Sequence, residues 1–126
     1  MRHSVEVMTD LEGLELAQRY LRERLPDGRT KTRDDERELM RNGAFLSELL
    51  ARRLGAVWVD LESSDSARWA MLIPAAPARE GGAMAYPPEP TRVWPFARVL
   101  RFVTMGHKER DLVSYYLELE ASARRS

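Results

Sequence analysis

The fold is decided where the stretch LSELLARRLGAVWVDL, residues 46–61, changes from one hydrophobic period to another. Up to Leu54 the apolar residues recur at helical spacing, whereas from Ala56 they alternate with a period of two, as in a half-buried strand. Gly55 separates the two patterns and suits the left-handed conformation in which many helices end. We therefore predict a helix that leads directly into a strand at the centre of the fold.

The helix in this stretch is predicted to begin just after Thr32. The Thr32 hydroxyl can cap it, and the acidic residues Asp34, Asp35 and Glu36 place negative charge on the positive end of the helix dipole. Its main apolar stripe is Leu39, Gly43, Leu46 and Leu50, and further apolar residues extend around it, namely Met40, Ala44, Phe45, Leu49 and Ala51. A helix that is apolar on several sides is usually central. Gly43, on the stripe, would let another element approach closely.

An earlier helix is predicted between Thr9 and a stop at residues 26–28. Thr9 and Glu12 have the spacing of a capping box, in which the threonine hydroxyl accepts a hydrogen bond from an amide of the first turn. Apolar residues then recur at helical spacing: Leu11, Leu14, Ala17, Leu21 and Leu25. Residues 1–8 would form an N-terminal tail or a short strand, and they lack the apolar segment of a secretory signal.

The strand at residues 56–62 is predicted to form the first arm of a β-hairpin. Its residues divide into two faces, with Val57, Val59 and Leu61 on one and Trp58, Asp60 and Glu62 on the other. Residues 63–66 favour a turn, and the partner strand at 68–73 places Trp69, Met71 and Ile73 on one face. Residues 92–94 would add a third strand.

Residues 74–95 hold six of the seven prolines and the pair Gly81-Gly82, so this segment is predicted to be a loop. A loop of this length is usually functional or mobile. The stretch Tyr86-Pro87-Pro88-Glu89-Pro90 contains a P-x-x-P pattern, for which a rigid connector is a better interpretation than a polyproline ligand.

Two helices are predicted after this loop. Pro95 opens the first of them at its favoured position, the apolar stripe is Phe96, Val99, Leu100 and Val103, and Gly106 ends it. The last helix begins near Glu109, and its apolar residues are Leu112, Tyr116, Leu119 and Ala123.

Together the elements predict a single α+β domain over residues 1–126. It has two N-terminal helices, a β-hairpin or small antiparallel sheet, and then two C-terminal helices packed on it, because a small sheet has an apolar face to bury. In the alternative arrangement, helices cover both faces of the hairpin and all three tryptophans are packed.

Composition excludes several function classes. The chain has no net charge, since 20 lysines and arginines balance 20 aspartates and glutamates, and this disfavours a nucleic-acid partner. Its apolar runs are far shorter than the ~20 residues of a membrane-spanning helix. It has no cysteine, which excludes thiol catalysis, disulfides and thiolate zinc sites. We expect a cytoplasmic protein with no nucleic-acid and no membrane partner.

Few residues are candidates for catalysis. His3 and His107 are the only histidines, and neither belongs to a zinc-binding spacing. Asp60, Glu62 and Asp65 lie near a turn and could hold a divalent cation, but the solvated face of a hairpin is the favoured interpretation. We therefore predict no catalytic residue, no metal site and no cofactor, and expect a protein that is not an enzyme.

Aromatic residues indicate an interaction surface instead, because Trp and Tyr dominate protein–protein interfaces. The predicted partner-binding residues are Trp58, Tyr86, Trp94, Arg98 and Arg101. The leading hypothesis is a non-enzymatic interaction or adaptor domain whose partner is another protein. The alternatives are a toxin-neutralising immunity protein and a small ligand-binding domain or enzyme that uses the carboxylate cluster. A homo-oligomer paired through the tyrosines and leucines of the last helix is a further hypothesis.

Two motifs resemble those of a family of small bacterial domains of unknown function. Gly43-Ala44-Phe45-Leu46-Ser47-Glu48 matches its G-x-x-L-x-E helix, and Gly55-Ala56-Val57-Trp58 matches the G-x-x-W strand that follows. The later Pro95-Phe96-Ala97-Arg98-Val99, Gly106 and Tyr115-Tyr116 are also similar, so the resemblance spans roughly residues 40–118. It implies an α+β domain of cytoplasmic bacterial type and carries over no activity.

Overall fold

The computed structural model describes residues 2–25, 28–74, 89–105 and 111–124. The elements follow in the order α1 (Arg2–Arg24), α2 (Arg33–Leu54), β1 (Val57–Asp60), a 3₁₀ turn η1 (Ser66–Arg68), β2 (Ala70–Ile73), β3 (Thr91–Val93), α3 (Pro95–Met105) and α4 (Leu112–Arg124). This order of two helices, a small antiparallel sheet and two helices confirms the predicted α+β fold.

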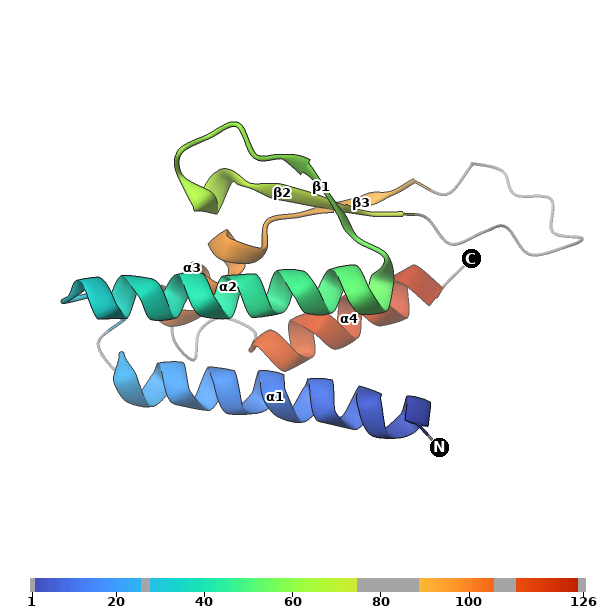
Figure 1. Cartoon of the computed structure of the whole chain (residues 1–126), viewed down its shortest axis with the longest axis horizontal. Helices are drawn as coiled ribbons and strands as arrows, with labels where there is room; N and C mark the ends of the chain where they lie inside the picture. The colour runs from blue at the N-terminus through green and yellow to red at the C-terminus, as the bar shows by residue number, and fades with distance from the viewer. Residues whose placement is uncertain (1, 26–27, 75–88, 106–110, 125–126) are drawn as a thin grey trace, which may run out of the picture.

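Helix α2 is the middle layer of the molecule. Figure 1 shows it between the sheet on one side and α1 and α4 on the other, and it contacts α1, α3, α4 and β2. Its buried side chains include Leu46, Leu49 and Leu50, none of which has measurable exposure. The prediction of a central helix, apolar on several sides, is confirmed.

The ends of α2 form as its sequence predicts. Thr32 is the N-cap, where its Oγ1 accepts a hydrogen bond from the Asp35 amide at 3.1 Å. Asp35 Oδ2 accepts in return from the Thr32 amide at 3.2 Å, which completes a capping box. At the other end Gly55 has a φ of 70° and donates its amide to carbonyls of the last turn. The helix therefore stops where β1 has to begin.

Helix α1 begins at Arg2, so the predicted start at Thr9 is wrong, and so is the tail or short strand at residues 1–8. Neither glycine nor proline occurs before Thr9, so nothing in the backbone stops the helix from extending past the capping motif. The Asp10 carboxylate accepts hydrogen bonds from Arg52 and Arg53 of α2, at 2.6 and 2.7 Å. The apolar stripe is confirmed by Leu14, Leu21 and Leu25, which are all buried.

The three strands form an antiparallel sheet in the order β1-β2-β3, so the predicted third strand is confirmed. Trp58 lies opposite Met71, which lies opposite Val93, and these residues line the inner face towards α2 and α3. Met71, Ile73 and Val93 are buried there. Strand β2 begins at Ala70, later than predicted, because the preceding residues form η1, whose N-cap is Asp65.

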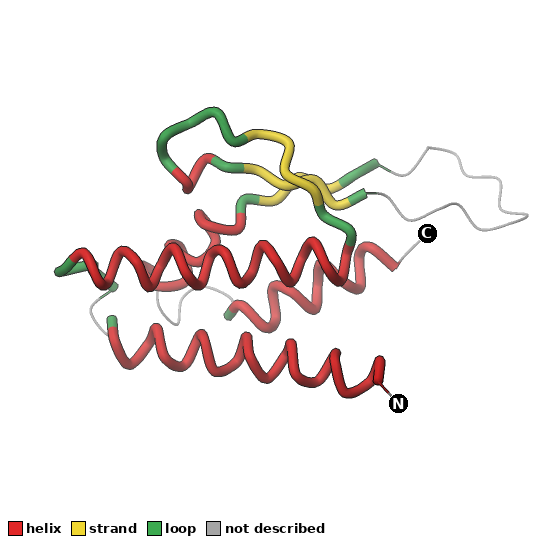
Figure 2. The backbone as a smooth tube through the Cα atoms, viewed as in Figure 1, coloured by secondary structure: helices red, strands yellow, loops and turns green. Residues whose placement is uncertain are grey.

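The faces of β1 differ from the predicted alternation. The register shifts between Trp58 and Asp60, as in a β-bulge, and Leu61 then lies on the side of Trp58 rather than with the valines. Val57 and Val59 are 57% and 44% exposed. Figure 2 shows helices α1 to α4 on one side of the sheet, as predicted for a sheet with one apolar face to bury. The alternative in which all three tryptophans are packed is not observed, since Trp94 is 44% exposed.

The C-terminal helices pack largely as predicted. In α3 Phe96, Val99 and Val103 are buried, but Leu100 is 40% exposed. The buried face is centred on Val99, and Leu100 lies about 100° round the helix from it. Phe102 fills the other flank of the face and is buried. The predicted end at Gly106 and start near Glu109 lie outside the described residues.

Helix α4 is attached to α1 through its first turn. Gln18, which is buried, accepts hydrogen bonds at its Oε1 from the Leu112 amide at 2.9 Å and the Val113 amide at 3.4 Å. Leu112 and Tyr116 are buried in the core of the chain itself. These two residues of the predicted apolar face of α4 therefore pack within the chain, whereas Leu117 of the same helix is 43% exposed.

Candidate functional site

An aromatic cluster joins the sheet to α3. The rings of Trp58 and Phe96 are stacked, with centroids 6.1 Å apart and an interplanar angle of 22°. Trp69 meets both of them edge-on, at 6.4 Å from Trp58 and 5.5 Å from Phe96. The three rings come from β1, from the residue that precedes β2, and from the first turn of α3. The cluster thus forms only when the hairpin and α3 are both in place.

Each ring of the cluster is held by a specific contact. Trp69 Nε1 donates a hydrogen bond to the Ser63 carbonyl at 2.7 Å, which fixes the indole against the hairpin turn. Phe96 lies directly on the backbone of α2 at Gly43, where a Cβ atom would come within 2.7 Å of its Cε1. The predicted close approach at Gly43 is therefore confirmed, and Phe96 is the element that approaches.

A groove runs along α2 beside this cluster, and we call it the α2 groove. It consists of two adjoining hollows that share Ala44 and Phe96. The first, of about 640 Å³, is lined by Arg33, Glu36, Arg37, Met40, Arg41, Ala44 and Phe96. The second, of about 350 Å³, is lined by Ala44, Ser47, Glu48, Ala51, Trp58, Leu61, Trp69 and Phe96.

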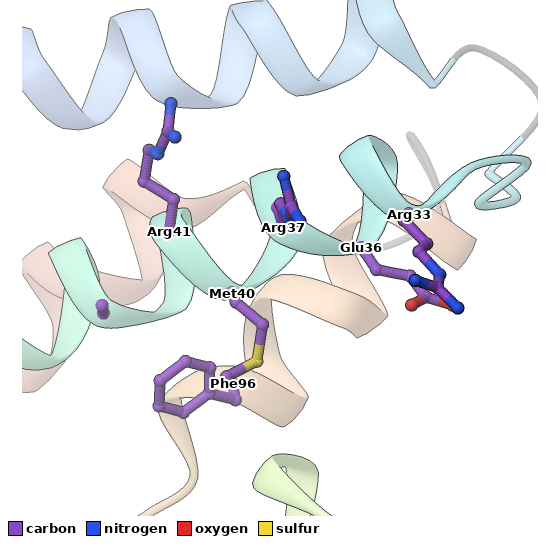
Figure 3. A pocket seen from close by; sticks show the side chains of 7 residues that line it. Arg33, Glu36, Arg37, Met40, Arg41 and Phe96 are labelled. Carbon is purple, nitrogen blue, oxygen red and sulfur yellow. The ribbon is translucent and has the colours of Figure 1, made fainter.

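The two walls of the α2 groove differ in chemistry. Figure 3 shows Met40 pointing towards Phe96 on one side of α2, while Arg37 and Arg41 project from the other side. Along the helix the lining residues form a broad strip, in which Met40 and Ala44 lie towards Phe96 and the arginines at 37 and 41 lie along the opposite edge. Ala44 lies between the walls and contributes only a methyl group. The groove therefore combines a low floor, an apolar wall with aromatic rings and a charged wall.

Asp35 anchors the end of α2 at which the groove begins. Its carboxylate accepts hydrogen bonds from the amides of Lys31, at 2.8 Å, and Thr32, and from Arg24 Nε at 3.1 Å. These hydrogen bonds, led by that from Lys31, outweigh the effect of desolvation and hold the pKa of Asp35 below its usual value. Asp35 is therefore ionised at neutral pH and ties the N-terminus of α2 to the end of α1.

The predicted partner-binding residues are separated in the structure. Trp58 is 37% exposed and belongs to the α2 groove. Trp94 is 44% exposed but is not part of the groove lining. The Arg98 guanidinium lies 4.6 Å from the ring centroid of Tyr115 in α4, and Arg101 is exposed on α3. Tyr86 lies outside the described residues.

Several groove residues were assigned by sequence to other roles or to none. Trp69 and Phe96 were predicted as hairpin and helix core, and Met40 and Ala44 only as additional apolar positions. The sequence does carry one sign of the groove, a second stripe along α2. Arginines at 33 and 37 begin this stripe, and apolar or small residues at 40, 44, 47 and 51 follow at helical spacing. The meeting of this stripe with the aromatic rings depends on tertiary packing.

The carboxylate cluster near the hairpin turn serves local structure. Asp65 Oδ1 accepts a hydrogen bond from the Ala67 amide at 3.0 Å, and Asp60 Oδ1 accepts from the Glu62 amide at 3.3 Å. Within the described ranges no three histidine or acidic residues come together in a way that could hold a metal ion. His107 and the side chain of His3 lie outside those ranges.

Among the described helices, none is both long enough and apolar enough to cross a membrane. Comparison of the whole chain with protein-family models, curated proteins and solved structures gives no match.

Proposed function

We propose that this chain is a non-enzymatic interaction domain that binds a segment of another protein in the α2 groove. The observation that carries the proposal is the partly exposed aromatic cluster beside an open face of α2. Trp58 remains 37% exposed although it is stacked on Phe96. Large aromatic side chains in such positions are the residues that most often dominate the energy of protein–protein binding.

The groove is suited to binding because its apolar wall is already assembled. Phe96 is packed on the α2 backbone and Trp69 is hydrogen-bonded to the hairpin turn. These rings therefore lose little conformational entropy when a partner binds, and preorganisation of this kind favours affinity. The partner would remove the exposed parts of Trp58 and Met40 from water, which is favourable for apolar surface.

The dimensions of the groove fit a short peptide segment. Its lining on α2 extends from Arg33 to Ala51, which is roughly 27 Å at the rise of an α-helix. An extended segment of about eight residues covers this length. The α2 groove thus matches the scale of helix-in-groove and extended-peptide recognition.

The proposal retains the adaptor role and the cytoplasmic location expected from the sequence and places Trp58 at the centre of the contact. It rests on the geometry of the groove, in which Trp58, Trp69 and Phe96 form one wall. Trp94, Arg98 and Arg101 lie outside the groove lining and are not needed for this mode of binding.

The test uses selection from a displayed library of random peptides, followed by affinity measurements on the enriched sequences. Ala44 is exposed and lines both hollows, so Ala44→Trp should fill the groove without disturbing the core. Ala121, an exposed alanine in α4, provides the matched control Ala121→Trp. We expect fluorescence anisotropy to give a loss of about tenfold or more for Ala44→Trp. The control should bind like the wild type.

Two results would contradict the proposal. One is a library that yields no enriched peptide on the wild-type protein. The other is a set of enriched peptides that bind Ala44→Trp as tightly as the wild type, because such peptides would use another surface. Circular dichroism of each variant establishes that the loss does not come from unfolding.

A further inference from the structure

The α2 groove has an uneven distribution of charge along its length. Its N-terminal hollow is lined by Arg33, Arg37 and Arg41 and by one acidic residue, Glu36. The hollow beside the aromatic cluster contains one charged residue, Glu48. The lining thus carries more basic than acidic groups at the end where α2 begins, whereas Glu48 at the other end lies 3.7 Å from Arg52 of the same helix.

The arginines at the basic end retain hydrogen-bonding capacity for a partner. Arg37 lies 3.7 Å from Asp34, with both side chains about three-quarters exposed at 74% and 73%. Arg41 Nη1 lies 3.3 Å from Glu38 Oε1; the Arg41 side chain is 75% exposed and the Glu38 side chain 17%. Each guanidinium has five N–H donors, so exposed donors remain on both arginines beside these contacts. A carboxylate of a partner can therefore bind them without breaking a buried interaction.

The apolar wall lies at a defined distance from these charges. Arg37 and Ala44 are two turns apart on α2, about 10 Å along the axis, and the aromatic cluster lies beside Ala44. A carboxylate and an apolar side chain three or four residues apart in an extended segment span the same distance. Both contacts are therefore available to one short peptide.

From this arrangement we infer that the partner segment is an acidic peptide with one bulky apolar anchor. The anchor rests against Phe96 and Trp58, and the carboxylates on one side of it face the arginines at the start of α2. Carboxylate and guanidinium groups form paired, charge-assisted hydrogen bonds, which give direction as well as affinity. Because the three arginines line only one end of the groove, they set the direction in which the acidic side of the peptide lies.

This inference rests on the proposed function, and the same peptide selection tests it separately. The wild-type protein should enrich peptides in which aspartate or glutamate lies on one side of an aromatic or large aliphatic residue. The charge-reversed variant R33E/R37E/R41E should lose this preference and enrich lysine or arginine in its place. The control R19E/R29E/R92E makes the same change in net charge at exposed positions outside the groove lining and should retain the wild-type preference.

A second variant keeps the test decisive if charge reversal impairs folding. R33Q/R37Q/R41Q removes the three charges without adding repulsion to the first turns of α2. For an acidic peptide selected on the wild type, we expect about tenfold weaker binding to this variant. Binding to the wild type should also weaken with rising salt concentration, and the loss should be smaller for the variant.

The possible outcomes separate the two proposals. Peptides that lose binding in Ala44→Trp but show no preference for acidic residues would overturn the inference and leave the groove as a binding site. Peptides that do not depend on Ala44 would overturn both. A dimer of the wild type that dissociates in Ala44→Trp, as measured by light scattering, would identify a second copy as the occupant and overturn the inference. Equal competition by a single-stranded oligonucleotide would overturn it in favour of a general polyanion site.

Discussion

The ring of Phe96 occupies the position that any side chain at residue 43 would need. A Cβ atom built on Gly43 would lie 2.7 Å from Cε1 and 2.9 Å from Cγ of Phe96, which is closer than such atoms normally approach. The absence of a side chain in the middle of α2 therefore sets the depth at which α3 packs. It also positions the apolar wall of the α2 groove, because Trp58 and Trp69 contact the same ring.

Substitution of Gly43 by alanine should destabilise the protein. In an isolated helix the change would be favourable by about 1 kcal/mol. Here we expect a net loss of about 1–3 kcal/mol, because the new methyl group displaces Phe96 from a packed position. Urea denaturation measures this difference. The variant G13A meets only the outer end of the Phe45 side chain, so its loss should be smaller. A G43A protein as stable as the wild type would show that α3 can move away freely.

The capping box of α2 predicts a second effect on stability. In Thr32→Ala the Asp35 amide loses its acceptor, and we expect a loss of about 1 kcal/mol in the free energy of unfolding. Thr32→Ser keeps the hydroxyl and should retain most of the stability. If alanine and serine behave alike in urea denaturation, the hydroxyl does not stabilise the helix.

Asp35 predicts an acid-sensitive component of stability. Its pKa in the folded protein lies below the usual value, chiefly because the Lys31 amide donates to the ionised carboxylate. The unfolded state therefore binds a proton at higher pH than the folded state does. This contribution is fully present above about pH 4, the ordinary aspartate pKa, and is lost as the pH falls through the folded pKa.

The measurement is urea denaturation of the wild type and Asp35→Asn between neutral and acidic pH. The asparagine variant should be less stable at neutral pH, and the gap between the two proteins should narrow as the pH falls below about 4. Asp34→Asn is the matched control, since Asp34 is exposed and makes only a weak contact with Arg37. A gap that stays constant with pH would contradict the assigned role of Asp35.

Gln18 should control the local stability of the first turn of α4. Its Oε1 is the acceptor for the Leu112 and Val113 amides in a buried position. In Gln18→Leu the Leu112 amide is left without this acceptor, which costs about 1–3 kcal/mol. Hydrogen exchange followed by NMR should show faster exchange at Leu112 and Val113 than in the wild type. Exchange at Leu49 and Leu50 in α2 provides the internal reference.

Local patterns predicted most of the fold, because they depend on neighbouring residues. The α2 cap at Thr32, its end at Gly55 and the buried stripe of α1 all follow from spacing and from the conformational preferences of single residues. The start of α1 was predicted wrongly for the same reason. Thr9 and Glu12 have the spacing of a cap, but a cap forms only where the preceding backbone leaves the helix, and here the helix continues to Arg2.

The candidate site was much less predictable, because it is made by contacts between distant segments. Trp58 was recognised as an interaction residue from its type and its face of the strand. The α2 residues that complete the groove were not, since an exposed Arg37 or Arg41 has no sequence signal that distinguishes it from any solvated arginine. Arg98 was predicted to bind a partner, but in the structure its guanidinium lies over the ring of Tyr115 in the same chain.

The shift in register within β1 also affects how the molecules behave at high concentration. Among the described strands β1 is paired on one side only, and the two valines on its outer face are 57% and 44% exposed. A flat apolar edge of this kind is a template onto which a strand from another molecule can add, as in fibrous aggregates. The irregularity after Trp58 bends the strand and interrupts its ladder, so an incoming strand finds only a short run of backbone to pair with. We therefore expect β1 to favour strand addition less than a regular edge strand with the same exposed valines would.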